Sequence, residues 1–196
     1  MRRRHGRYEF HETTELAYRR QTKILMPLVD EILAPFSSNP AIDGYENHVY
    51  RVIEFSTELA DLDVGELQKI TIAACFHDLG IYSDNTFDYL PPSIELARSY
   101  LQRTGRVDWI DEIASMIDLH HRLRKITGPG SHLAEIFRKA DLIDFSLGLA
   151  TCGLPRSTVS EVRGKFPNNG FHRNLAWVAC GWIARHPLRP VPVLKW

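Results

Sequence analysis

Apolar side chains recur every three or four residues along most of this chain, and this spacing restricts its fold more than any other feature. Residues spaced in this way share one face of an α-helix, and that face can be buried against other helices. No segment shows a convincing alternation of polar and β-branched residues of the kind that forms a strand. The sequence therefore predicts an all-α bundle of about seven to eight helices.

The predicted helices are separated by breaks rich in glycine and proline. Pro27 is expected to kink or divide the first helix, and Gly80 is expected to end the third in the left-handed conformation. Asp43 and Glu46 have the spacing of an N-terminal capping box. The predicted helices span residues 11–34, 45–60, 65–79, 93–103, 107–122, 131–147, 157–166 and 171–185.

The length of 196 residues suits one domain, or at most one domain with an appendage. We expect an N-terminal helical extension over residues 1–42 that packs on a core at residues 43–148. Helices and an extended tail over residues 149–196 should belong to the same globular unit. No internal repeat is found, which argues against a solenoid.

The net charge, the cysteine content and the length of the apolar runs restrict which partners the protein can bind and in which cellular compartment it can occur. Lys plus Arg and Asp plus Glu each number 24, whereas proteins that bind nucleic acid non-specifically are normally basic. Three widely spaced cysteines offer neither a disulfide framework nor a CxxC pair, which favours a reducing compartment. No apolar run is long enough for an export signal or a membrane span. We therefore expect a cytoplasmic protein with no membrane contact and no non-specific nucleic-acid binding, and a homo-oligomer is compatible with the sequence.

Several histidines and acids fall on helix faces that should be buried. His48, His77 and His120 continue apolar stripes, Asp141 lies on or beside another stripe, and Asp78 follows His77. A buried carboxylate is costly unless it pairs with a cation or binds a metal. Two neutral histidines with two carboxylates carry charge minus two, which one divalent ion would cancel. For each residue alone, a hydrogen-bonded core position or a surface ion pair is the competing interpretation.

One ordered combination of residues resembles the HD-domain superfamily of metal-dependent phosphohydrolases over roughly residues 43–148: His48, His77-Asp78 in FHDLG, His120-His121, and Asp141 in RKADLID. That family is an all-α domain in which a His, a His-Asp pair and a later Asp bind a divalent metal. The resemblance implies that His48, His77, Asp78 and Asp141 hold one such ion. Mixed nitrogen and oxygen ligands suit Mn, Fe, Co, Ni or Mg, and zinc is less favoured without thiolates.

Family members that bind a second metal carry further histidines between the His-Asp pair and the last Asp. Either His120 or His121 fits the later of these positions, whereas Ser93 stands where the earlier histidine would be. A dinuclear iron oxygenase similar to myo-inositol oxygenase is therefore the least favoured hypothesis for this chain.

The resemblance implies hydrolysis of a phosphate ester or anhydride of a small molecule, for example a nucleotide. The catalytic candidates are His120 and His121, which could protonate the leaving oxygen or bind a transient second ion, and Asp84, an acid shortly after the His-Asp pair. The predicted substrate-binding cations are Arg51, Arg122, Arg124 and Lys125. The RLRK segment is equally typical of a solvated helix C-terminus. A regulatory module that binds a metal or a nucleotide without turnover is the alternative.

Overall fold

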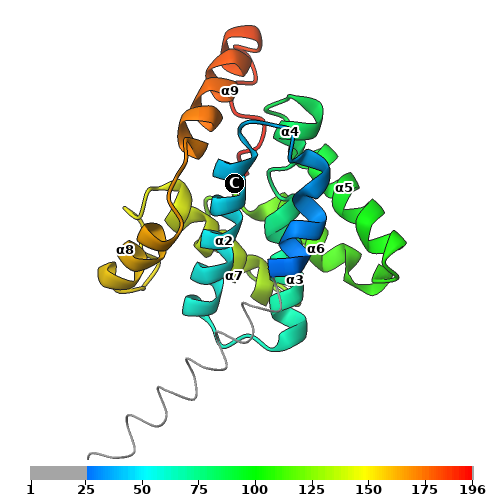
Figure 1. Cartoon of the computed structure of the whole chain (residues 1–196), viewed down its shortest axis with the longest axis vertical. Helices are drawn as coiled ribbons and strands as arrows, with labels where there is room; N and C mark the ends of the chain where they lie inside the picture. The colour runs from blue at the N-terminus through cyan, green and yellow to red at the C-terminus, as the bar shows by residue number, and fades with distance from the viewer. Residues whose placement is uncertain (1–25, 196) are drawn as a thin grey trace, which may run out of the picture.

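The computed structural model describes residues 26–195, and within them helices account for all the regular structure apart from one isolated bridge between Arg122 and Lys195 (Figure 1). The all-α prediction is therefore confirmed. No helix in this part of the chain is both long enough and apolar enough to span a bilayer. Residues 26–33 are helical and are followed by η1 (Ala34–Phe36), α2 (Ile42–Leu59), α3 (Val64–Phe76), α4 (Gly80–Asp84), α5 (Leu90–Arg103), η2 (Val107–Trp109), α6 (Ile110–Leu119), α7 (His132–Phe145), α8 (Arg156–Lys165) and α9 (Phe171–Arg185).

Helix α2 runs through the middle of the bundle, where it packs against α3 and α7 (Figure 1). Helices α5 and α6 pack together beside α3, while α8 and α9 contact α2. The core contains the apolar stripes expected from the sequence, including Val49 and Val52 of α2, Ile70 of α3 and Phe137 of α7. The part of the predicted first helix before residue 26 lies outside the described residues.

The two helices that follow the first loop begin differently from expectation. Helix α2 begins at Ile42, so Asp43 already lies in its first turn and the capping box predicted with Glu46 is wrong. The box occurs instead at α3, where Asp63 Oδ1 accepts the Glu66 N–H at 2.8 Å and Glu66 Oε2 accepts the Asp63 N–H at 3.0 Å. This reciprocal cap satisfies two N–H groups that the helix start leaves free.

Gly80 does not adopt the predicted left-handed conformation, and it begins α4 instead. A Cβ at this position would lie 2.5 Å from the Tyr89 carbonyl oxygen and 3.0 Å from Ser93 Oγ. The Gly80 N–H donates to Ser93 Oγ at 2.9 Å. Glycine is therefore required because α5 begins so close to the turn that carries His77 and Asp78.

Candidate metal centre

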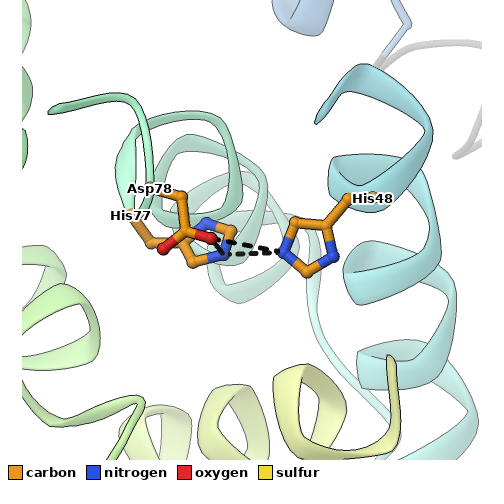
Figure 2. A group of neighbouring side chains, drawn as sticks. All are labelled: His48, His77 and Asp78. Atoms are coloured by element: carbon orange, nitrogen blue, oxygen red, sulfur yellow. Dashed lines mark hydrogen bonds and ion pairs between the residues drawn. The ribbon is translucent and has the colours of Figure 1, made fainter. Parts of the chain in front are cut away.

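Three separate elements direct the four predicted ligands toward one point. Figure 2 shows His48 of α2 facing His77 and Asp78 at the end of α3. The Nε2 atoms of His48 and His77 lie 2.9 Å apart. Asp141 of α7 brings Oδ1 to 3.5 Å from His48 Nε2 and 3.7 Å from His77 Nε2. All four side chains are buried, and Asp141 is only 3% exposed.

The adjacent residues His77 and Asp78 can both face this point because α3 ends just before them. His77 is the C-cap of α3, and the chain turns over residues 77–79 before α4 begins. In a continuous helix, neighbouring side chains would diverge by about 100°. Here Asp78 Oδ2 lies 3.6 Å from His77 Nε2.

Hydrogen bonds fix the orientation of both imidazoles. His48 Nδ1 contacts Asp144 Oδ2 at 2.6 Å, and His77 Nδ1 contacts the Ala74 carbonyl oxygen at 2.8 Å. A carboxylate and a carbonyl only accept hydrogen bonds, so we assign the proton to each Nδ1. Each Nε2 then presents a lone pair to the centre, as a metal ligand requires.

Asp144 and Phe171 hold His48 in place. Asp144 is buried and receives the guanidinium of Arg51 through bonds of 2.6 Å and 2.8 Å. Burial opposes ionisation of Asp144, but the hydrogen bond from His48 and the charge of Arg51 outweigh it and lower the pKa of Asp144. Phe171, the first residue of α9, stacks on the His48 ring with centroids 4.1 Å apart.

This arrangement fits a bound cation. Two lone pairs facing each other across 2.9 Å repel unless a proton or a metal ion lies near them. Burial lowers the pKa of His77, but the carboxylates of Asp78 and Asp141 outweigh burial and raise that pKa to about 9. The four residues thus attract positive charge strongly, and their nitrogen and oxygen donors suit a divalent transition metal or Mg²⁺.

His120 adds an unused donor beside the first group. Its Nδ1 donates to the Ile117 carbonyl oxygen at 2.7 Å, which leaves Nε2 with a lone pair 3.5 Å from Asp78 Oδ1. Both atoms are buried, and within the described residues neither has a hydrogen-bond partner. Buried polar atoms without a partner are rare in folded proteins, and they often mark a place where an ion or a water molecule binds.

His121 completes a second group that could hold a metal. Asp78, His120 and His121 offer ligand atoms that all lie within 4.8 Å of one another. His121 Nε2 hydrogen bonds with the Tyr89 hydroxyl at 2.7 Å, and its Nδ1 lies 3.9 Å from Asp141 Oδ2. Burial and the neighbouring His120 lower the pKa of His121 to about 3, so this imidazole is neutral near pH 7.

A cavity of about 430 Å³ reaches this centre at His120, His121 and Asp141. Of the predicted substrate-binding residues, Arg122 lines it, and Arg122 Nε is buried with no hydrogen-bond partner in the described part of the chain. Arg124 and Lys125 are exposed and lie outside the lining. Only the first cation of the RLRK segment therefore faces the candidate site.

Arg51 and Asp84 lie elsewhere. Arg51 is buried and does not line the cavity, and its Nε, Nη1 and Nη2 atoms already donate to Asp144 and to the carbonyl oxygens of Phe166 and Pro167. Asp84 is exposed, accepts the Ser83 hydroxyl at 2.6 Å and does not line the cavity. These placements do not support the roles predicted for the two residues.

Sequence reasoning missed Asp144 and His172. Asp144 lies three residues after Asp141 on the same inward face of α7, and that spacing was the available signal. His172 lines the cavity from α9, where Nε2 contacts the Asp144 carbonyl oxygen at 3.1 Å and Nδ1 hydrogen bonds with Asn168. No local pattern marks His172, because its position depends on how α9 packs.

Residues 45–146, more than half of the chain, match the family model of the HD domain. This segment includes all four converging ligands, together with Asp144 and the second group of donors. Comparisons with curated proteins and with solved structures gave no match.

Proposed function

The chain belongs to the HD-domain family, and from this premise we propose that it is a metal-dependent hydrolase of small phosphate esters or anhydrides. The observation that supports this most directly is the convergence of His48, His77, Asp78 and Asp141 beside a cavity. Families built around this ligand pattern are mostly metal-dependent hydrolases, so the proposal extends a family property to these residues.

Each part of the centre has a separate task in this proposal. A bound divalent ion would lower the pKa of water and polarise a phosphoryl oxygen. His48, His77, Asp78 and Asp141 hold the ion, and Asp144 keeps His48 in the correct tautomer. Arg122 lines the cavity, and its Nε has no hydrogen-bond partner within the described residues, so its guanidinium would pair with a phosphate oxygen.

The donors around His120 favour a second candidate function. Asp78, His120 and His121 could hold a second ion beside the first, which is the arrangement that oxidation by a dinuclear iron centre would need. Ser93 does not take part, because its Oγ accepts the Gly80 N–H. The number and identity of the bound ions therefore separate hydrolysis from oxidation.

The test combines metal analysis with turnover. Protein purified without oxygen is analysed for metal, then stripped with a chelator and reloaded separately with Mn²⁺, Fe²⁺, Co²⁺, Ni²⁺ or Mg²⁺. Phosphate release is measured on p-nitrophenyl phosphate, nucleotides, sugar phosphates and alkyl phosphates. We expect hydrolysis that depends on an added ion and that Asp78→Ala abolishes, while Asp61→Asn, a change at an exposed position, leaves it intact.

Other results would contradict the proposal. Stoichiometric metal with no phosphate release from any ester would instead indicate a binding module. Two tightly held irons with oxygen consumption would instead indicate an oxygenase.

A further inference from the structure

The lining of the cavity beside the candidate metal centre consists of two chemically different groups of residues. One group comprises His120, His121 and Asp141 of the centre together with Arg122. The remaining wall is almost entirely apolar and includes Phe87, Phe145, Leu175, Ala179, Val191 and Val193. The volume of about 430 Å³ lies within the range of roughly 300–1,000 Å³ that is usual for small-molecule sites.

The C-terminal part of the chain builds much of this apolar wall. Leu175 and Ala179 come from α9, and Val191 and Val193 come from the tail that follows it, so all four lie beyond the segment that matches the family model. Much of the apolar wall is therefore built by residues outside the segment that matches the family model.

Specific contacts hold the tail against the cavity. The Leu123 N–H donates to the Lys195 carbonyl oxygen at 3.0 Å, and Lys195 Nζ pairs with Asp118 at 2.5 Å. Val193 is buried in a cluster with Phe87 and Tyr89. These contacts fix the tail in place as part of the cavity wall.

Most polar groups around the cavity already have hydrogen-bond partners, so few remain to bind polar parts of a substrate other than its phosphate. The guanidinium of Arg138 is engaged by Glu135, and both ring nitrogens of His172 have partners. In the described lining, Arg122 Nε is the buried donor that lacks a partner. The hydroxyls of a sugar or the base of a nucleotide would lose their hydrogen bonds to water on this wall and gain few in return.

We propose that the substrate is a phosphate monoester of an apolar alcohol, with an aliphatic or aryl group in the cavity and the phosphate at the metal centre. This inference rests on the proposed hydrolase function. In the reaction, water forms a new bond to phosphorus, the bond from phosphorus to the ester oxygen breaks, and a proton passes to that oxygen. The products are the apolar alcohol and inorganic phosphate.

The test compares esters that differ only in the alcohol. Octyl phosphate and glycerol 3-phosphate both have a primary alcohol as the leaving group, so their intrinsic reactivities are similar. With the metal-reloaded protein we expect kcat/KM to be at least tenfold higher for octyl phosphate than for glycerol 3-phosphate or AMP. Equal values, or a preference for either polar ester, would overturn the inference while leaving the hydrolase function in place.

A binding measurement supplies a readout that does not depend on turnover. The affinity for octylphosphonate, which cannot be hydrolysed at an ester bond, is measured by calorimetry on the full chain. Leu175→Asn should weaken binding at least fivefold, whereas Leu188→Asn, at a fully exposed tail position outside the lining, should not. Ala179→Phe, which fills the cavity, provides a second variant, and circular dichroism verifies the fold of each.

Together, the kinetic and binding measurements distinguish a failure of the apolar-substrate inference from a failure of the proposed hydrolase function. In one outcome, octylphosphonate binds, both Leu175→Asn and Ala179→Phe weaken this binding, and no ester is hydrolysed. That outcome would support the apolar ligand class and contradict only the hydrolase function. Absence of binding, or binding that the cavity variants leave unchanged, would overturn the inference.

Discussion

Asp144 links the metal centre to the rest of the protein although it is not one of the four converging ligands. It accepts hydrogen bonds from His48 and from Arg51 at the same time, and both partners are buried. Residues that orient a metal-ligating histidine typically change metal affinity by about 10–100-fold when they are altered. Arg51 therefore reaches the centre through Asp144.

Replacing Asp144 tests this role. Asp144→Asn keeps the size of the side chain but removes the charge that Arg51 and the His48 Nδ1–H require. We expect metal affinity to fall by about 10–100-fold, measured by competition with a fluorescent chelator. Asp61→Asn is the matched control, and equal affinity for the two variants would exclude a positioning role for Asp144.

Glu135 provides a pH-dependent contribution to stability outside the four converging ligands. Burial opposes its ionisation, but hydrogen bonds from Arg138 and from the Ile126 N–H outweigh burial and lower the pKa of Glu135 below its ordinary value of 4.5. A carboxyl with a lowered folded pKa contributes stability above its unfolded pKa, and this contribution disappears as the pH falls through the folded pKa.

Glu135→Gln should therefore destabilise the protein at pH 7 by about 1–3 kcal/mol, the usual range for losing charged hydrogen bonds. The difference from wild type should shrink as the pH falls below the unfolded pKa of about 4.5. Urea unfolding at pH 7 and pH 4 measures both values. Glu95→Gln, at an exposed position on α5, controls for the loss of a surface charge, and a deficit that stayed constant with pH would refute this assignment.

At the scale of the element, close approach between helices decides where glycine is required. A Cβ on Gly44 of α2 would lie 2.9 Å from the Asn169 carbonyl oxygen, just before α9. In contrast, a Cβ on Gly164 of α8 would meet no atom within 4 Å. The approach at Gly44 lets Phe171 stack on His48, so the packing of α9 and the geometry of the metal centre are coupled.

Alanine substitutions at these two positions should have opposite effects. Gly164→Ala should stabilise the protein by up to about 1 kcal/mol, because alanine loses less backbone entropy than glycine in a helix. Gly44→Ala should destabilise it by about 1–3 kcal/mol, because backbone atoms must move to admit the Cβ. Chemical denaturation measures both changes, and a stabilising Gly44→Ala would show that α9 packs less tightly on α2 than its position indicates.

For the whole molecule, the metal centre is a contact between distant parts of the chain. The four residues proposed as its ligands come from α2, from the turn after α3 and from α7, which pack together only in the folded bundle. An ion that binds the folded state alone stabilises it by about 2.7 kcal/mol when present at 100 times its Kd. For a chain of this size, each 1 kcal/mol raises Tm by about 2–4 °C.

Metal removal should therefore lower Tm by about 5–10 °C. Thermal unfolding followed by circular dichroism, with the ion and then with a chelator, measures the shift. His77→Gln should abolish the shift, while Asp61→Asn should preserve it. An identical Tm with and without the ion in the wild-type protein would count against binding at this centre.

The sequence by itself predicted most of the helical segments but not α4, and its ordered pattern, which resembles the HD-domain family, selected the four residues that converge. Apolar spacing and the inward direction of His48, His77 and Asp141 are local properties, because the position of a side chain on a helix follows from residue number alone. The sequence pattern predicts the start of α5 too late, at residue 93 instead of Leu90, because Pro91 and Pro92 resemble a break, although proline fits the first turn of a helix.

Only the tertiary structure decided which polar side chains remain free to act. Arg51 and Arg122 each follow a predicted site histidine closely in the sequence. Packing pairs Arg51 with Asp144, whereas it places Arg122 in the cavity lining with no hydrogen-bond partner for Nε within the described residues. The apolar wall likewise depends on the return of α9 and the tail to the centre. Hydrogen-bond partners from distant segments are set by how helices pack, and helical periodicity carries no information about that packing.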